Sequence, residues 1–560
     1  MSLNDRLASA IAVAGIAVCY AVFGLVVLVP EGLYSGDIGV KFVQARALAD
    51  SGFTSLDLPY PGAFLDPARE FFPLRPPFVM KVADETQAIF SPAVAVLQGG
   101  LAAAAGLRGL TLLSVCAAIA VLLAVRHLAP AGLKTAAVVS VGLASPLWSY
   151  AVLGWEHAPA VAFSTIAFAI AAWSTNRWSS VFAGALLGAG ALLRDEVLLV
   201  LPGLLLISLW RTRSPGSPVL AALGAFVVLA CGGTIDALHF GRPVAAHLLH
   251  AVDVAGSDID DAVPALEQLT TRGRYEAVVQ YWLLGYGNDF WIGVFAATFV
   301  VALAVRWRWP TTLGTVPLWL WLSGVVILGA MDAWEFATAP KWLAGLHRVS
   351  PYLVCALLPA PFLGKKDRQL TLPIVVTSVI FVAVAFAMTK TTGGKSLGPR
   401  LLLPLLPLLA VAALVRIAEY VKSDARIERL MGIAGVALVV IGAIIHLAGT
   451  VPAYYVRNRD DSSAVLTALR SPARVVVADD MFTAQLLFPL YYRKIILLAD
   501  TYELRARLGT RLADEKVPEA LLISRRPEPG MRLSPLKIRQ SDSVGRFIIQ
   551  YWGRVGRDLN

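Results

Sequence analysis

The sequence is short of charged residues and short of cysteine. Of its 560 residues, 15% are charged and 57% are hydrophobic, whereas a soluble globular chain carries about 25% charged residues. This composition excludes an ordinary soluble globule. The four cysteines (Cys19, Cys116, Cys231 and Cys355) lie in or beside apolar runs and form no Cys-x-x-Cys pair or Cys/His cluster. We therefore expect neither a disulfide framework nor a zinc site.

The sequence is rich in long apolar runs. Runs of about 15–22 residues have the length of membrane-spanning helices, whose backbone polar groups are satisfied within the helix. The first run, 11–29, is too long for the apolar core of a signal peptide, and no small-residue cleavage site follows it, so we interpret it as a retained span. About thirteen spans are expected, near 10–29, 109–125, 135–152, 158–174, 179–193, 197–210, 218–238, 286–305, 314–331, 346–363, 371–389, 401–418 and 430–450.

The basic residues predict which way these spans run. The connections on one side carry Arg6, Arg126, Lys134, Arg177, Arg211, Arg213, Arg306, Arg308, Lys365, Lys366, Arg368, Arg416, Lys422, Arg426 and Arg429. Cationic residues gather in cytoplasmic loops. The N-terminus is therefore predicted inside and the C-terminus outside. Topology then accounts for the net charge of +10, and no nucleic-acid partner is expected.

Three longer stretches are predicted to lie outside the membrane, at about 30–108, 239–285 and 451–560. The last alternates β-like runs at 475–477, 495–498 and 520–523 with helix-like segments, a pattern typical of a small α/β domain with a partly parallel sheet. The sequence thus predicts a polytopic α-helical membrane domain, 1–450, and an extracytoplasmic α/β domain, 451–560.

Asp37 is the first candidate for chemistry. It follows the first span in Tyr34-Ser35-Gly36-Asp37, and the next residues place polar side chains at 37, 41, 44 and 46 and apolar ones at 38, 42, 45 and 48. This spacing favours an amphipathic helix on the membrane surface. Asp37 is expected either to cap that helix or to serve as a general base, and the two roles are compatible.

Arg400 is the second candidate. The run from Gly393 through Lys395 to Pro399 and Arg400 is rich in glycine, and Pro399 suits the first turn of a helix. A helix N-terminus together with a guanidinium group binds phosphate well. A snorkelling arginine at the lipid headgroups is the alternative.

Other charged residues fall in predicted outside loops. Arg194, Asp195 and Glu196 join two short apolar helices, where they either form a self-neutralising turn or line a cavity. Glu156 and His157 form another outer turn, for which a structural role is favoured over metal binding. Lys41 and Arg75 are further cations that could meet an anionic headgroup.

These features together resemble the GT-C superfamily of integral-membrane glycosyltransferases. The local resemblance lies in Ser35-Gly36-Asp37, in Ile89-Phe90-Ser91-Pro92, in the stretch from Gly184 to Glu196, which ends in Leu-Arg-Asp-Glu, and in Gly398-Pro399-Arg400. Members such as the aminoarabinose, protein mannosyl and arabinofuranosyl transferases use sugars carried on polyprenyl phosphates. Here Asp37 is followed by Ile38, whereas the aminoarabinose and protein mannosyl types usually show Asp-Glu at this site.

The resemblance implies a transferase of the bacterial inner membrane that acts in cell-envelope glycan biosynthesis. Asp37 would be the catalytic base. Arg400 would bind the donor phosphate. From their positions, we add Lys395, Arg194, Lys41 and Arg75 as further candidates for the phosphate, and Glu156, His157, Asp195 and Glu196 as candidates for the acceptor site or cavity. The acceptor (a glycan, lipid or protein) and the use of a divalent cation stay open; no metal ligands are assigned and no other cofactor is expected.

Two other functions are compatible with the composition. A transporter or flippase of lipid-linked sugars needs charged or broken helices near the bilayer centre and often internal repeats. Pro404 and Pro407 could break one helix, but no repeat is evident and the charges sit at the ends of the spans. A non-catalytic assembly protein whose outer tail recruits partners is the third interpretation.

Overall fold

The computed structural model describes residues 3–76, 78–82, 85–240, 271–285, 289–309, 312–338, 345–359, 364–388, 399–525, 533 and 536–553. Most of the predicted outside stretch 239–285 and the candidate Lys395 lie outside these residues. The chain forms two compact units. Unit 1 comprises 1–22, 114–235 and 258–453, and unit 2 comprises 23–113, 236–257 and 454–560.

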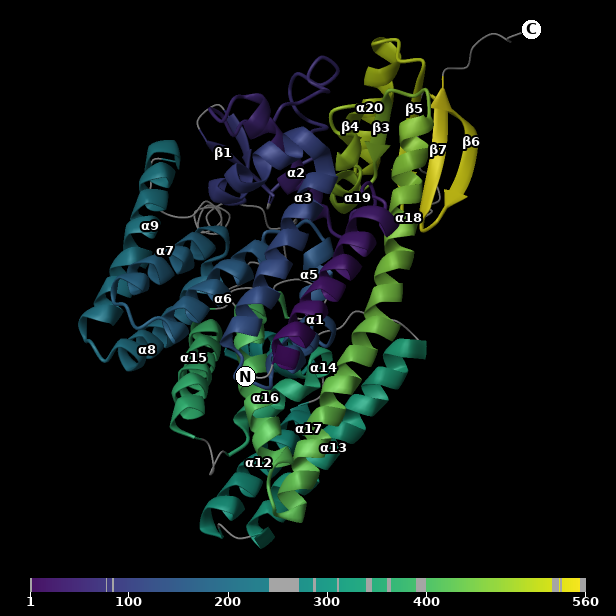
Figure 1. Ribbon diagram of the computed structural model, residues 1–560. Coiled ribbons are helices and arrows are strands. Elements are labelled where there is room, and N and C mark those ends of the chain that lie inside the picture. Colours follow the sequence, from purple (N-terminus) through teal and green to yellow (C-terminus); the bar gives the residue numbers. More distant parts are fainter. Residues whose placement is uncertain are drawn as a thin grey trace. The chain divides into compact units, whose positions relative to one another are not determined.

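The fold is that of a polytopic α-helical membrane protein with a small sheet near its C-terminus (Figure 1). Among the described residues, seven helices are long and apolar enough to cross a membrane. They are Asp5–Val27, Pro92–Leu128, Gly216–Leu238, Gly314–Thr338, Asp367–Met388, Arg400–Val421 and Arg426–Arg470.

Unit 1 is built from helices. In chain order it contains α1 (Leu3–Val22), the end of α3 (Pro92–Leu128), α4 (Lys134–Leu143), α5 (Leu147–Val152), α6 (His157–Trp173), α7 (Trp178–Leu193), η2 (Asp195–Val200), α8 (Leu201–Thr212) and α9 (Gly216–Phe240). Beyond the undescribed 241–270 follow α11 (Thr271–Tyr275), η3 (Glu276–Leu284), α12 (Asp289–Arg308), α13 (Thr312–Thr338), α14 (Leu346–Val349), η4 (Pro351–Leu357), α15 (Lys365–Met388), η5 (Arg400–Leu405), α16 (Leu406–Val421), α17 (Arg426–Ile444) and η6 (Ile445–Thr450).

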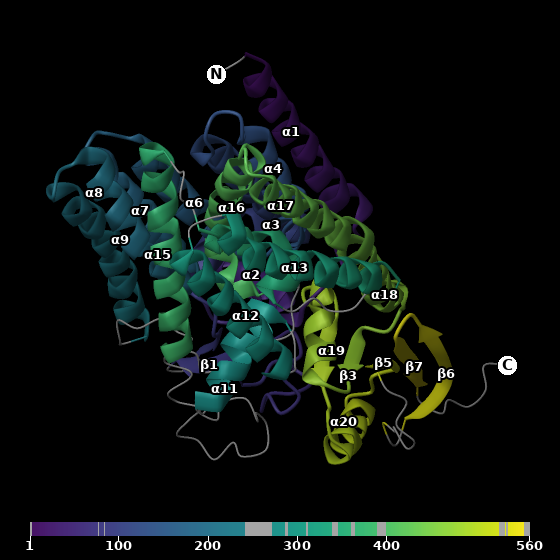
Figure 2. The ribbon, with the colours of Figure 1, turned by 90° about the horizontal axis from the view of Figure 1, so that it is seen from below.

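Small residues bring some of these helices close together. α6, α7 and α8 pack with one another, and α8 packs with α15 (Figure 2). A Cβ added at Gly184 of α7 would clash with the carbonyl oxygen of Ala221 in α9, and one at Gly224 would clash with that of Val181. Because apolar side chains gain little from association in lipid, close backbone approach at such positions is a main source of helix packing.

Two of the predicted spans are interrupted. The span expected at 135–152 is broken into α4 and α5 at Ser145-Pro146, and the span at 346–363 into α14 and the 3₁₀ segment η4 at Ser350-Pro351. Proline lacks the N–H that a continuous helix needs and disfavours helical geometry in the residue before it. The prediction of a continuous helix was therefore wrong at both places. It rested on the length of the apolar runs and did not take the two prolines into account.

Unit 2 combines residues near the first span with the tail. It contains η1 (Phe23–Val27), α2 (Gly36–Asp50), the hairpin of β1 (Val79–Val82) and β2 (Glu85–Ala88), and the start of α3. α3 begins at Pro92, inside the stretch 30–108 that we assigned to the first external loop. From the tail come most of α18 (Val451–Arg470) and then β3 (Val475–Ala478), α19 (Met481–Leu486), η7 (Phe488–Leu490), β4 (Ile495–Leu498), α20 (Tyr502–Asp514), β5 (Glu519–Ser524), β6 (Lys537–Val544) and β7 (Phe547–Gly553).

The tail confirms the predicted α/β pattern. Its five-stranded sheet has the order β4-β3-β5-β7-β6. β3 pairs in parallel with β4 and β5, while β7 pairs antiparallel with β5 and β6. All four residues of β3 are buried, as expected for a strand in a parallel sheet covered on both faces. α19 and α20 connect the three parallel strands (Figure 1).

Candidate functional site

Asp37 lies in the first turn of α2, in unit 2. Ser35 is the N-cap of this helix, and its hydroxyl oxygen accepts a hydrogen bond from the backbone N–H of Asp37 at 3.3 Å. The prediction that Asp37 itself caps the helix was therefore wrong, because the serine two residues earlier takes that position. A carboxylate in the first turn is still stabilised by the helix dipole.

The helix α2 does not have the solvated polar face that the spacing predicted. Lys41 is 3% exposed and Gln44 is 1% exposed, so both lie on faces covered by other parts of unit 2. The Lys41 ammonium lies 4.4 Å from the centroid of the Phe90 ring, and Gln44 donates to the Phe90 carbonyl at 3.1 Å. α2 also packs against α19 and β2. Cation–π contact and hydrogen bonding let these polar groups sit inside.

Arg75 belongs to the same unit. Its guanidinium forms an ion pair with Asp500, just after β4, at 2.9 Å, and each side chain is about one-third exposed. The pair connects the first loop to the tail within unit 2. An anionic ligand at Arg75 would have to compete with the Asp500 carboxylate.

In unit 1, Glu156, His157, Arg194 and Glu196 lie together. Arg194 follows α7, and its Nε lies 2.9 Å from Glu196 Oε1, while its Nη1 lies 3.4 Å from Glu156 Oε1. His157 Nδ1 lies 3.6 Å from the same Glu156 oxygen. Glu156 and His157 are each 2% exposed. The structure thus brings together candidate residues from two separate turns that lie up to 40 positions apart in the chain.

The charge balance of this cluster is set by its carboxylates. Burial works against the charged form of Arg194, but the neighbouring Glu196 and Glu156 outweigh it and raise the pKa of the guanidinium. Arg194 therefore stays charged and is held by two carboxylates, as buried charges require. Asp195, the first residue of η2, adds a third acidic residue to the turn.

Aromatic rings border the cluster on the α5–α6 side. The ring centroids of Trp155 and His157 are 5.0 Å apart, those of Tyr150 and His157 are 5.2 Å apart, and those of Tyr150 and Trp155 are 5.8 Å apart. All three side chains are buried. The histidine thus packs as part of an aromatic group, which fits the structural role favoured for it above.

Arg400 is the first residue of the 3₁₀ segment η5, directly before α16. η5 packs against α6 and against η2, the elements that begin at His157 and Asp195. The segment carrying Arg400 is therefore next to the segments carrying the Glu156–Arg194 cluster. Pro399 lies at the N-cap position of η5, one residue earlier than the first-turn position that the sequence suggested.

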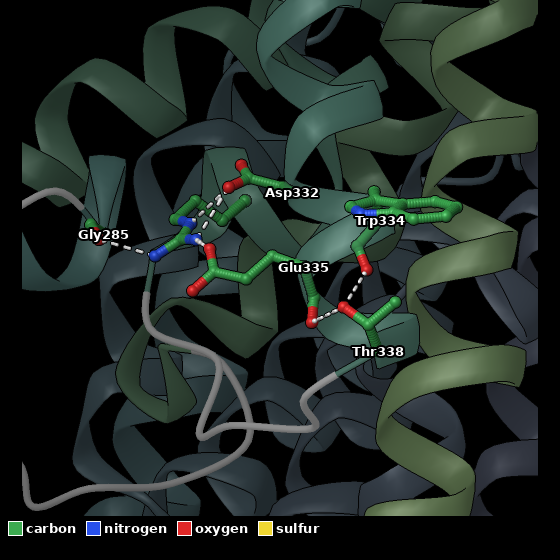
Figure 3. A network of polar contacts seen from close by, with 6 residues as sticks. Gly285, Asp332, Trp334, Glu335 and Thr338 are labelled. Carbon is green, nitrogen blue, oxygen red and sulfur yellow. Dashed lines mark hydrogen bonds and ion pairs between the residues drawn. The ribbon is translucent and has the colours of Figure 1, made fainter.

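The sequence did not single out Arg348, which forms another polar network in unit 1 (Figure 3). Its guanidinium donates to Asp332 at 2.7 Å and to Glu335 at 3.2 Å, both in α13, and to the carbonyl of Gly285 at 3.4 Å. Asp332 and Glu335 lie just beyond the end of the span expected at 314–331, and α13 extends through both of them. Their i, i+3 spacing on one helix face was the available signal for a shared cationic partner.

Metal binding was left open by the sequence. Among the residues that the structure describes, no group of three or more His, Cys, Asp or Glu side chains is arranged to hold a metal ion.

Comparison with known proteins gives structural similarity alone. No family model matches the chain, and no curated protein matches it. Among solved structures, it is similar to ArnT from Cupriavidus metallidurans bound to undecaprenyl phosphate, with 13% identity and a TM-score of 0.46. It is also similar to ArnT from the same organism in the apo state, with 15% identity and a TM-score of 0.41. Each match covers 97% of both chains.

Proposed function

We propose that this protein is a membrane glycosyltransferase that moves a sugar from a polyprenyl-phosphate donor to an extracytoplasmic acceptor. The observation that carries the proposal is the packing of η5, which begins at Arg400, against α6 and η2 beside the charged Glu156–Arg194 cluster. A set of ionisable side chains among apolar helices suits a ligand with a charged headgroup and a long apolar tail.

The proposed reaction is a single displacement at the anomeric carbon. The acceptor hydroxyl gives its proton to the Asp37 carboxylate, and its oxygen forms the new glycosidic bond. The bond between the anomeric carbon and the phosphate oxygen breaks, and polyprenyl phosphate leaves with the electron pair. Because the acceptor attacks from the face opposite the leaving group, the configuration inverts.

The cations have different parts in this proposal. Negative charge grows on the departing phosphate, and a preorganised guanidinium lowers the barrier by stabilising it. Arg400 is our first choice for this role, with Lys395, in the same run, as its partner. Arg194 is already held by Glu156 and Glu196, so we assign it to shaping the cavity with Glu156, His157, Asp195 and Glu196. Lys41 and Arg75 are each engaged within unit 2.

The test is turnover of a labelled polyprenyl-phosphate sugar by the purified protein in detergent. A transferase releases product without membrane compartments, whereas a transporter does not. The Asp37→Asn variant is expected to lose roughly 10²–10⁴-fold in kcat, the range that a general base contributes, while it still binds donor. Substrate turnover at the wild-type rate in this variant would remove Asp37 from the mechanism.

The matched control is Asp50→Asn, the same substitution at the other end of α2. Asp50 pairs with Arg46 at 2.8 Å on the exposed side of the helix, and exposed i, i+4 pairs contribute about 0.3–0.5 kcal/mol. We expect near-normal kcat from this variant. An equal loss of activity in both variants would point to damage to α2 rather than loss of a base.

A further inference from the structure

The tail part of unit 2 contains a cavity that the transfer reaction does not use. Its volume is about 420 Å³, within the range of roughly 300–1,000 Å³ typical of small-molecule sites. It lies at the amino ends of the parallel strands β3 and β4. Its walls are formed by Pro61, Phe64, Leu65, Arg474, Val475, Tyr492, Arg493, Lys494, Ile495, Glu515, Lys516, Val517 and Pro518.

Cations dominate the polar part of this wall. Lys494 is engaged, because its ammonium donates to the carbonyls of Ser471 and Ala473 at 2.6 and 2.8 Å. The side chains of Arg474, Arg493 and Lys516 make no hydrogen bond or ion pair with any residue that the structure describes, and all three are exposed.

The acidic residue of the wall does not cancel this charge. The Glu515 carboxylate oxygen Oε1 lies 3.9 Å from Nε of Arg511, one turn earlier in the chain. Glu515 is thus paired with an arginine that does not line the cavity. Three uncommitted cations around one concave surface create a positive potential that favours an anion. Guanidinium groups in particular bind phosphate oxygens in pairs.

Two aromatic rings, Phe64 and Tyr492, contribute to the apolar part of the wall. Phe64 is 66% exposed, so its ring is accessible to a ligand at this surface. Tyr492 is fixed, because its hydroxyl donates to the Val43 carbonyl at 3.0 Å and its ring lies beside Arg46. A fixed ring and an exposed ring beside cations provide an apolar surface for the C–H face of a sugar and charges for its phosphate.

We propose that this cavity binds a phosphorylated saccharide of one or two rings. The volume limits the ligand to this size, the cations require an anionic substituent, and the rings favour a carbohydrate over inorganic phosphate. The site does not depend on the transfer reaction proposed above.

The experiment is calorimetric titration of the purified full-length protein in detergent with three probes: glucose 6-phosphate, inorganic phosphate and glucose. We expect glucose 6-phosphate to bind most tightly. Arg493→Glu is expected to weaken that binding about tenfold or more, the equivalent of one lost charge-assisted hydrogen bond. Phe64→Ala is expected to weaken the binding of glucose 6-phosphate and to leave the binding of inorganic phosphate unchanged.

The matched control is Arg470→Glu, which reverses an exposed cation of the same unit that does not line the cavity. It should leave the affinity for glucose 6-phosphate within about twofold of the wild-type value, because solvent screens an exposed charge that does not line the cavity. A titration with short-chain phosphatidic acid in the same micelles tests whether the cavity binds the phosphate headgroup of a lipid instead. Three results would overturn the proposal. They are glucose 6-phosphate binding that does not saturate, an Arg493→Glu variant that binds glucose 6-phosphate as tightly as wild type does, and binding of phosphatidic acid alone among the probes.

Discussion

At the residue scale, charged groups in this protein act in pairs and small clusters. Asp479 is an example outside the proposed chemistry. It follows β3, and Ser524, at the end of β5, donates a hydrogen bond to its carboxylate. Burial, together with the adjacent Asp480, raises the pKa of Asp479 from 3.8 to about 6. The folded protein therefore holds this proton at pH values where the unfolded chain has released it.

This shift predicts a pH-dependent effect of Asp479→Asn. Because the folded state binds the proton more tightly, the contribution of Asp479 to the free energy of unfolding is greatest below about pH 4. It declines as the pH rises toward 6 and is then constant. The variant cannot ionise, so its Tm relative to wild type should rise through this window and level off above it. Thermal unfolding in detergent at several pH values measures the difference, and a pH-independent difference would contradict the assignment.

The sequence identified many of the candidate residues but not their surroundings. Arg194 was selected because buried charges near apolar helices usually pair, and Glu156 because it lies in an outer turn. Their pairing with each other is seen in the structure alone. Ser35 was visible beside Asp37 but was not chosen as the cap, because both residue types favour that position. Arg348 was missed, since the i, i+3 spacing of Asp332 and Glu335 predicts a shared cation but does not say which residue of another helix supplies it.

At the element scale, the Arg348 network connects α14 to α13. Asp332 is 9% exposed in its side chain and accepts two hydrogen bonds from Arg348. We predict that Arg348→Met destabilises the protein by about 3 kcal/mol, because it leaves the Asp332 carboxylate buried without its cation. The free energy of unfolding, measured by denaturant titration in mixed micelles, checks this.

Two further variants separate the causes in that experiment. Glu335 is 42% exposed, so Glu335→Gln is expected to cost less than about 1 kcal/mol. The double variant Arg348→Met/Asp332→Leu removes the stranded carboxylate and should regain much of the lost stability. A double variant that is no more stable than Arg348→Met would show that packing, not charge, holds α14.

The contact between α2 and α19 makes a second prediction at this scale. A Cβ added at Gly39 would clash with the backbone carbonyl of Gln485, whereas one at Gly100 in α3 meets nothing within 4 Å. Gly39→Ala should therefore lower stability by about 1–3 kcal/mol. Gly100→Ala should raise it by about 0.5–1 kcal/mol, the usual gain in a helix. Equal Tm shifts in the same direction would contradict the close approach of α19 to α2.

The character of α2 was mispredicted for a related reason. The spacing of polar residues at 37, 41, 44 and 46 describes one solvated face, but Lys41 and Gln44 are buried and both contact Phe90. Phe90 lies more than 40 residues further along the chain, so no local pattern could reveal this contact. Three tail strands, by contrast, were predicted, because the short apolar runs at 475–477, 495–498 and 520–523 carry the signal locally. The strands β6 and β7 were not predicted.

At the scale of the whole molecule, hydropathy predicted a polytopic membrane protein and basic residues predicted its orientation. Seven long apolar helices among the described residues agree with the first prediction. The orientation, with the N-terminus inside, stays a prediction. The breaks at Pro146 and Pro351 show that apolar composition alone overestimates helix continuity.

The central proposal requires an acid from unit 2 and a cation from unit 1 to act on one donor molecule. The most direct measurement is a cryo-EM structure of the full-length protein with a polyprenyl phosphate bound. The account predicts phosphate oxygens within about 3 Å of the Arg400 guanidinium, with the Asp37 carboxylate lining the same cavity. A phosphate bound elsewhere, or an Asp37 separated from it by packed side chains or by the bilayer, would contradict it.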